Sequence, residues 1–205
     1  MTRKNLVRMA LAVLTSSLVL AGCSSNNTGS TGSTSNSAPS SGAVAAAAGE
    51  HNQADVTFTQ GMIPHHEGAI DMAKLVQGRT TNAKVVDLAS RIEKAQDPEI
   101  ATMTGWLKAW GAEASTGSMP GMNHGSSVPG MMDPQDMAKL EQAKSADFDK
   151  MFLDMMIKHH QGAIDMAKTE LQNGSSADAK KLAQQIIDSQ QAEITEMKGL
   201  LTAGG

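Results

Sequence analysis

The chain repeats one stretch of sequence, MIPHHEGAIDMAK at residues 62–74, as MIKHHQGAIDMAK at residues 156–168. The two copies stay in register, without a gap, well beyond these stretches. Internal similarity at a fixed offset indicates that one structural unit occurs twice. We therefore expect repeat one, 55–111, and repeat two, 147–205, to form the same structure.

Each repeat has the apolar spacing of a helical hairpin. In repeat two, apolar residues recur at steps of three and four from Leu182 to Leu201, which is the period of an α-helix, and repeat one matches this from Leu88 to Leu107. No alternating strand pattern of useful length occurs. The sequence predicts helices over about 55–77, 82–110, 146–172 and 177–202.

Two antiparallel hairpins with matching apolar faces predict an all-α fold, a four-helix bundle. Asn82 and Ser176 can cap the second helix of each hairpin. Pro64 and Pro98 occur in repeat one only, so we expect kinks in its helices and no breaks. Aromatic residues make up only 2% of the chain, so the core must consist of Ala, Leu, Ile and Met.

The first 22 residues have the features of a bacterial lipoprotein signal peptide. Three basic residues precede an apolar run at 11–20, which is too short for a permanent membrane helix. Leu-Ala-Gly-Cys follows at 20–23, and Cys23 is the only cysteine of the chain. We predict that Cys23 is lipidated after cleavage. An ordinary secretory signal with a chance cysteine is the alternative.

Residues 23–50 are expected to tether the folded part to the lipid. They are dominated by Ser, Thr, Asn and Gly as far as residue 42, a composition typical of a flexible linker. Removing the signal peptide takes away three basic residues and no acidic ones, so the formal net charge changes from −4 to −7. This acidic balance argues against a nucleic-acid partner. The predicted location is extracytoplasmic, on the cell membrane.

Each copy of the repeated stretch carries two histidines and two methionines. Thioether sulfur is a soft ligand that selects Cu(I), whereas imidazole binds both Cu(I) and Cu(II). Neither group has to lose a strongly held proton near neutral pH, and no oxidisable thiolate is needed. We predict a copper site, with Cu(I) favoured and Cu(II) allowed, formed by Met62, His65, His66, Met72, Met156, His159, His160 and Met166.

A helical wheel places Met62 and His66 one turn apart on the inward face, beside the small Ala69. His65 and Met72 fall to one side of that face. Under two-fold symmetry the two inward faces can meet inside the bundle. A buried methionine can also be ordinary core filler, so a structural lipoprotein without metal remains an alternative.

Two glutamates also match between the repeats, each four residues before a methionine. Glutamate is seldom buried without a partner. Glu99 and Glu193 could accept a hydrogen bond from a ligand imidazole, or bind the ion directly. A partly exposed carboxylate is the alternative. Met103 and Met197 join them as further candidates.

A methionine-rich loop, residues 115–133, separates the repeats. A core cannot explain methionines in a segment of Gly, Pro and Ser, so we expect an irregular, mobile arm that acquires Cu(I). A low-complexity linker is the alternative, and Pro134 can start a short helix through Leu140. The accessory ligands of this arm would be Met119, Met122, His124, Met131 and Met132.

The motif M-I-x-H-H-x-x-A-x-x-M-A, duplicated behind a lipoprotein signal with an M-P-G-M loop between, resembles the secreted bacterial family catalogued as domain of unknown function 305. The resemblance covers 51–205 and implies a ferritin-like four-helix bundle there. Some members of that family are linked to copper binding and copper tolerance. The family motif falls on the same eight histidines and methionines. Between the copies, the main departure is Glu67 against Gln161.

We therefore expect a membrane-anchored copper-binding protein, not an enzyme, that buffers or sequesters copper or hands it on to an unknown partner. A ferritin-like redox enzyme is the alternative. Di-iron bundles, however, use several inward carboxylates and Glu-x-x-His motifs, and the sequence has no Glu-x-x-His. It also has no arrangement of a catalytic nucleophile, phosphate loop or zinc finger.

Overall fold

The computed structural model describes residues 49–113 and 128–203, and within them it contains five α-helices and no β-strand. The predicted signal peptide, most of the predicted linker and three of the loop candidates lie outside the described residues. Those candidates are Met119, Met122 and His124, and the predicted lipidation site Cys23 lies outside as well.

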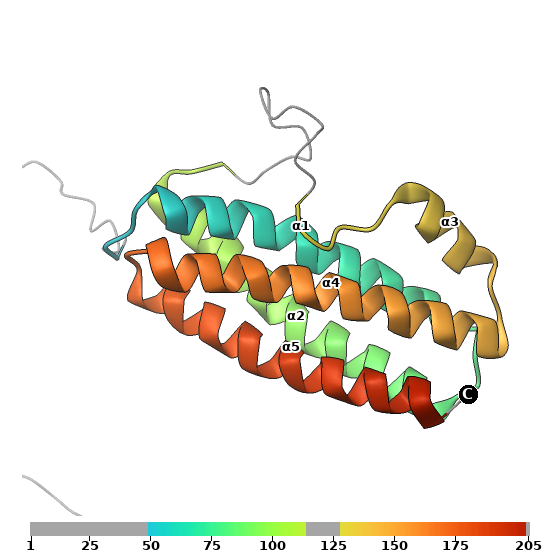
Figure 1. The fold of residues 1–205 in the computed structure, drawn as a ribbon. Coiled ribbons are helices and arrows are strands. Elements are labelled where there is room, and N and C mark those ends of the chain that lie inside the picture. The colour runs from blue at the N-terminus through green and yellow to red at the C-terminus, as the bar shows by residue number, and fades with distance from the viewer. Residues whose placement is uncertain (1–48, 114–127, 204–205) are drawn as a thin grey trace, which may run out of the picture. The chain divides into compact units, whose positions relative to one another are not determined.

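The two repeats form two helical hairpins. Repeat one gives α1 (Gln53–Leu75) and α2 (Ala83–Trp110), and repeat two gives α4 (Ser145–Asn173) and α5 (Ala177–Ala203). The first helices of the two hairpins, α1 and α4, pack against each other (Figure 1). This is the all-α four-helix bundle of two repeated hairpins that the sequence predicts.

Local capping signals set the starts of three of these helices, α1, α2 and α5. Asn82 Oδ1 accepts a hydrogen bond from the Lys84 amide, and Ser176 Oγ accepts one from the Ala179 amide, as expected. α1 begins two residues earlier than predicted, because Asn52 and Asp55 form a capping box. Neither proline ends its helix, since α1 and α2 continue through Pro64 and Pro98.

One aspartate of each repeat holds the start of a helix in the other repeat. The Asp55 carboxylate on α1 accepts a hydrogen bond of 2.9 Å from the backbone amide of Ser176, where α5 starts. Its counterpart Asp149 on α4 accepts one of 2.9 Å from the side chain of Asn82, which caps α2. The hairpins are therefore joined at both ends by equivalent contacts.

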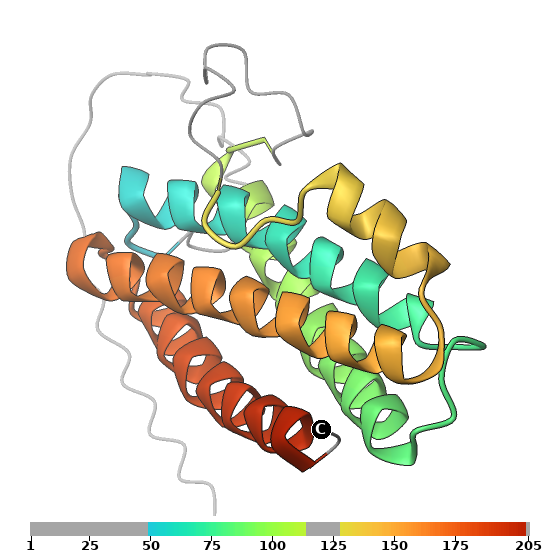
Figure 2. The ribbon, with the colours of Figure 1, turned by 45° about the vertical axis from the view of Figure 1, so that its right-hand side comes forward.

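A short helix, α3 (Pro134–Gln142), connects the hairpins and lies over α1 and α4 (Figure 2). Its Leu140 is fully buried in the core. Arg79, after α1, donates a hydrogen bond of 3.0 Å to the carbonyl of Glu141 and so holds the end of α3. Across residues 49–113 and 128–203, no helix combines the length and apolar character needed to cross a membrane.

A layer of polar side chains divides the apolar core of the bundle in two. One cluster includes Met72, Ile92 and Phe152, and the other includes Phe58 and Ile186. The positions between them along the four long helices carry polar side chains that are at most 3% exposed. We call these residues the histidine layer: His65, His66, Gln96, His159, His160 and Gln190.

Candidate metal centre

The two repeats meet at a pair of histidines in the middle of the bundle. The rings of His65, from α1, and His159, from α4, have their centroids 3.7 Å apart, with planes inclined by 41°. The helical wheel had suggested that the faces bearing His66 and His160 would meet. That expectation is wrong, because the α1–α4 contact runs along the neighbouring side of each helix.

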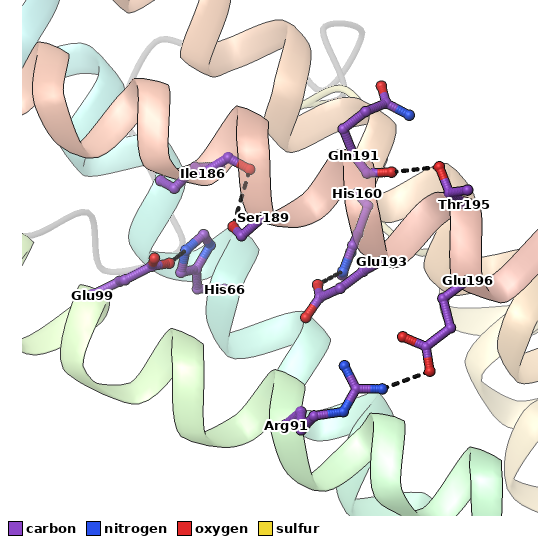
Figure 3. A network of polar contacts seen from close by, with 10 residues as sticks. All are labelled: His66, Arg91, Glu99, His160, Ile186, Ser189, Gln191, Glu193, Thr195 and Glu196. Atoms are coloured by element: carbon purple, nitrogen blue, oxygen red, sulfur yellow. Dashed lines mark hydrogen bonds and ion pairs between the residues drawn. The ribbon is translucent and has the colours of Figure 1, made fainter. Parts of the chain in front are cut away.

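His66 and His160 instead point within their own hairpins, each toward a glutamate (Figure 3). His66 Nε2 lies 2.7 Å from Glu99 Oε2, and His160 Nε2 lies 2.7 Å from Glu193 Oε2. Both rings are fully buried, whereas the glutamate side chains are 20% and 14% exposed. A neutral imidazole that donates its Nε2 proton to the carboxylate keeps a free lone pair on Nδ1.

The histidine layer contains several buried polar atoms that have no hydrogen-bond partner within the described chain. They are Nδ1 of all four histidines, Nε2 of His159, and Oε1 of Gln96 and Gln190. Each unsatisfied buried group typically costs about 1–3 kcal/mol, and folded proteins keep few of them. Their concentration in one layer indicates a site for a cation, which would accept a lone pair from one nitrogen of each ring and from the two amide oxygens.

Both central histidines are neutral near pH 7. Burial lowers the pKa of His65 to about 4, although its hydrogen bond to a backbone carbonyl acts in the opposite direction. Burial also lowers the pKa of His159 to about 2, and the neighbouring His65 and His160 add to this effect. A metal ion would therefore displace no proton from either ring at neutral pH.

Thioether groups lie on both sides of the histidine layer. Met62 and Met156 are fully buried, each one helical turn before a layer histidine, and Met72 is fully buried too. Met166 is half-buried. Met103 and Met197 are fully buried, each in one of the two apolar clusters.

Within residues 49–113 and 128–203, no three His, Cys, Asp or Glu side chains converge to hold an ion. A site for a hard cation is thus not formed by these groups alone. The chemistry of the available donors fits a soft ion bound by imidazole together with thioether sulfur.

The end of the methionine-rich loop, Val128–Met132, lies against the bundle. Pro129 and Gly130 form a turn on the surface of the bundle, and the Pro129 carbonyl accepts a hydrogen bond of 3.0 Å from His65 Nε2. Met132 packs against the apolar core, whereas Met131 is 42% exposed. The turn fits directly against α4, and the mobility expected for the loop at 115–133 stays a prediction.

Sequence reasoning missed four residues at this site. Gln96 and Gln190 could have been found, because they match between the repeats and interrupt an otherwise apolar stripe. Pro129 and Gly162, which lie in contact near His65, carry no such signal. Their contact joins a loop to a helix distant in sequence.

Comparison with known proteins places this arrangement among related chains. The family model described as "Domain of unknown function (DUF305)" matches residues 55–201. A solved DUF305 protein from Streptomyces coelicolor is 32% identical, with a TM-score of 0.68, over 74% of this chain and 94% of that chain. A DUF305 fragment from Deinococcus radiodurans is 30% identical, with a TM-score of 0.67, over 74% of this chain and 97% of that one.

The solved structures also include CopM. Its Cu(II)-bound form is 33% identical, with a TM-score of 0.63, and the match covers 73% of this chain and 96% of that one. CopM has also been solved in Cu(I)-bound, silver-bound and apo forms. No curated protein matches the chain.

Proposed function

The chain belongs to the DUF305 family, and on that basis we propose that it binds copper in the histidine layer as a membrane-anchored, extracytoplasmic protein. It would buffer or sequester copper, or hand it on. The observation that carries the proposal is the set of buried ring nitrogens without partners, next to fully buried thioethers. The bound forms of CopM support it, because that relative takes up Cu(I), Cu(II) and silver.

The layer suits Cu(I) for two physical reasons. The first is charge: the donors of the layer are neutral, so a monovalent ion brings only one net charge into the core. Glu99 and Glu193, at the edge of the layer, balance that charge in part. Those carboxylates also orient His66 and His160 and make the rings stronger donors. Met62 and Met156 would supply the sulfur that favours Cu(I) over harder ions.

The remaining features of the proposal come from the sequence. The signal peptide, Cys23 and the linker would hold the bundle on the outer face of the membrane. The related protein from Streptomyces coelicolor is itself proposed to be a secreted protein. Exposed Met131, with Met119, Met122 and His124, would form the accessory arm. We propose binding without catalytic turnover, and the protein that gives or receives the copper is unknown.

A competition titration with Cu(I), Ag(I) and Zn(II) tests the proposal. Met62→Leu together with Met156→Leu nearly conserves volume, so the fold should remain. The double variant should lose Cu(I) and Ag(I) affinity by at least about tenfold, or about 1.4 kcal/mol, while Zn(II) binding changes little. Met151→Leu, at a partly buried methionine that packs on the core away from the layer, is the control. Unchanged Cu(I) affinity in the double variant would show that this sulfur serves only packing.

A further inference from the structure

The four histidines of the layer are at most 1% exposed, so an ion reaches them only if part of the surface moves. One segment covers His65 without belonging to a helix. We call this segment, Val128–Met132, the latch. Its Pro129 carbonyl accepts the hydrogen bond from His65 Nε2, at 3.0 Å.

The latch is a tight turn. The Met131 amide donates a hydrogen bond of 3.1 Å to the Val128 carbonyl, and Gly130 has a φ of +78°. Proline followed by a glycine with positive φ is typical of a type II turn. In Figure 2 the chain before α3 dips toward α1 and α4 at this place.

The turn lies directly on the backbone of α4. A Cβ atom added to Gly162 would overlap the Pro129 carbonyl. From the other side, a Cβ atom on Gly130 would lie 2.8 Å from the Lys158 carbonyl and 2.9 Å from the His159 carbonyl. The latch is thus held by a close fit between two glycines, by one hydrogen bond to a histidine and by the packing of Met132 on the core.

The two repeats differ at this point. The repeat-one counterpart of Gly162 is Gly68, and a Cβ atom added there would meet only His159 Nε2, at an ordinary contact distance of 3.4 Å. Both glycines lie in long helices of the bundle, but only Gly162 is covered by a turn. The fold therefore does not require a turn over this glycine. The latch is therefore an addition to the symmetric fold.

A groove of about 480 Å³ leads from solvent to the latch. It runs beside α1 and α4, and its lining includes Phe58, Pro129, Asp165 and Met166. Met166 is the one half-buried member of the eight predicted ligands, since the other seven are at most 1% exposed. An ion in this groove would thus meet a thioether on one side and the latch at the end.

We propose that the latch gates the passage of copper between this groove and the histidine layer. The inference rests on the proposed function. Opening the latch breaks the hydrogen bond between Pro129 and His65 and exposes the His65–His159 pair to the groove, while the four long helices stay in place. A gate of this kind slows uptake and release by the same factor, so weakening it raises both rates and leaves their ratio unchanged.

The test compares two glycine substitutions in the full chain, Gly162→Ala beneath the latch and Gly105→Ala on α2. The rates are those of Cu(I) transfer to and from a colorimetric Cu(I) chelator, followed by stopped-flow absorption. We expect Gly162→Ala to displace the latch and to raise both rates about tenfold, with the dissociation constant changed by less than about twofold. Gly105→Ala, where an added Cβ atom meets no heavy atom within 4 Å, should leave both rates near those of the wild type.

Gly130→Ala provides a second variant from the loop side. It strains the turn at a positive φ and lies in no helix, so the bundle should fold even if Gly162→Ala does not. It should raise both rates as well.

Unchanged rates in the folded variants, with wild-type binding intact, would overturn the gate alone. So would faster release without faster uptake, since the latch would then be part of the binding site. If the wild type bound no Cu(I), the proposed function would fail, and the gate with it.

Discussion

The imidazole rings of His65 and His159 lie with their centroids 3.7 Å apart at the contact between α1 and α4. Each ring comes from a different copy of the same sequence. One copy alone therefore supplies half of the centre, and the duplication brings the halves together in one chain. His66 and His160 extend the layer outward on either side of this pair, each toward its own glutamate.

Neutralising both glutamates should weaken copper binding. We expect Glu99→Gln with Glu193→Gln to lower Cu(I) affinity by about 10–100-fold, because the rings of His66 and His160 lose a charged hydrogen-bond partner. Competition titration of the purified protein measures this. Glu196→Gln is the control, since Glu196 bonds to Arg91 on the surface. An affinity within about twofold of wild type would mean that the carboxylates do not support the ligands.

A buried carboxyl outside the layer should make the stability of the fold depend on pH. Glu170 is 1% exposed, where repeat one buries Val76. Burial, with the nearby carboxylate of Asp55, raises the pKa of Glu170 from 4.5 to about 8. The folded state thus keeps a proton that the unfolded state releases, and the contribution of Glu170 to the free energy of unfolding falls as pH rises from about 4.5 to about 8.

Glu170→Val and Glu170→Gln should both remove this contribution. Denaturant unfolding at pH 5 and pH 8 is the measurement, and the difference from wild type reports Glu170 together with its effect on the neighbouring Asp55. Both variants should lose less stability than wild type between the two pH values. Burial acts to raise the pKa of Asp55 too, but hydrogen bonds from three backbone amides, with the neighbouring Glu170, outweigh it, so Asp55 titrates below this window. Equal pH dependence in all three proteins would refute the assignment.

The sequence was sufficient for the fold because its signals are local and occur twice. Apolar spacing located the four long helices, and Asn82 and Ser176 started helices as expected. The wheel failed to show which histidines meet. It gives the direction of a side chain about its own helix axis, and the neighbour on that side is set by tertiary packing. His65 and His159 were therefore placed among the ligands but not as a pair.

The latch could not be predicted from the sequence, whereas the buried carboxyl could have been. The latch depends on backbone shape, because Pro129 fits where Gly162 lacks a side chain, and neither residue type signals that contact. Glu170 did carry a signal, since its counterpart in repeat one is Val76. A charged residue at a position that is apolar in the other copy indicates a local change of environment. Here Glu170 lies beside the carboxylate of Asp55.

The lipid anchor is tested by Cys23→Ser. Without the thiol no lipid can be attached, so the protein should leave the membrane fraction and appear in the soluble extracytoplasmic fraction. Fractionation followed by immunodetection measures the distribution, and circular dichroism should show unchanged helical content. Equal membrane retention of the variant and the wild type would rule out an anchor at Cys23.

The central claim is that the histidine layer binds copper, and a Cu(I) competition titration of His66→Ala with His160→Ala tests it most directly. His51→Ala is the control, because His51 stacks on Trp110 and lies outside the layer. The double variant should keep its helical content and bind Cu(I) at least about tenfold more weakly, a loss of about 1.4 kcal/mol, while the control binds as the wild type does. If the folded double variant bound Cu(I) as tightly as the wild type, these histidines would be packing residues and the account would be wrong.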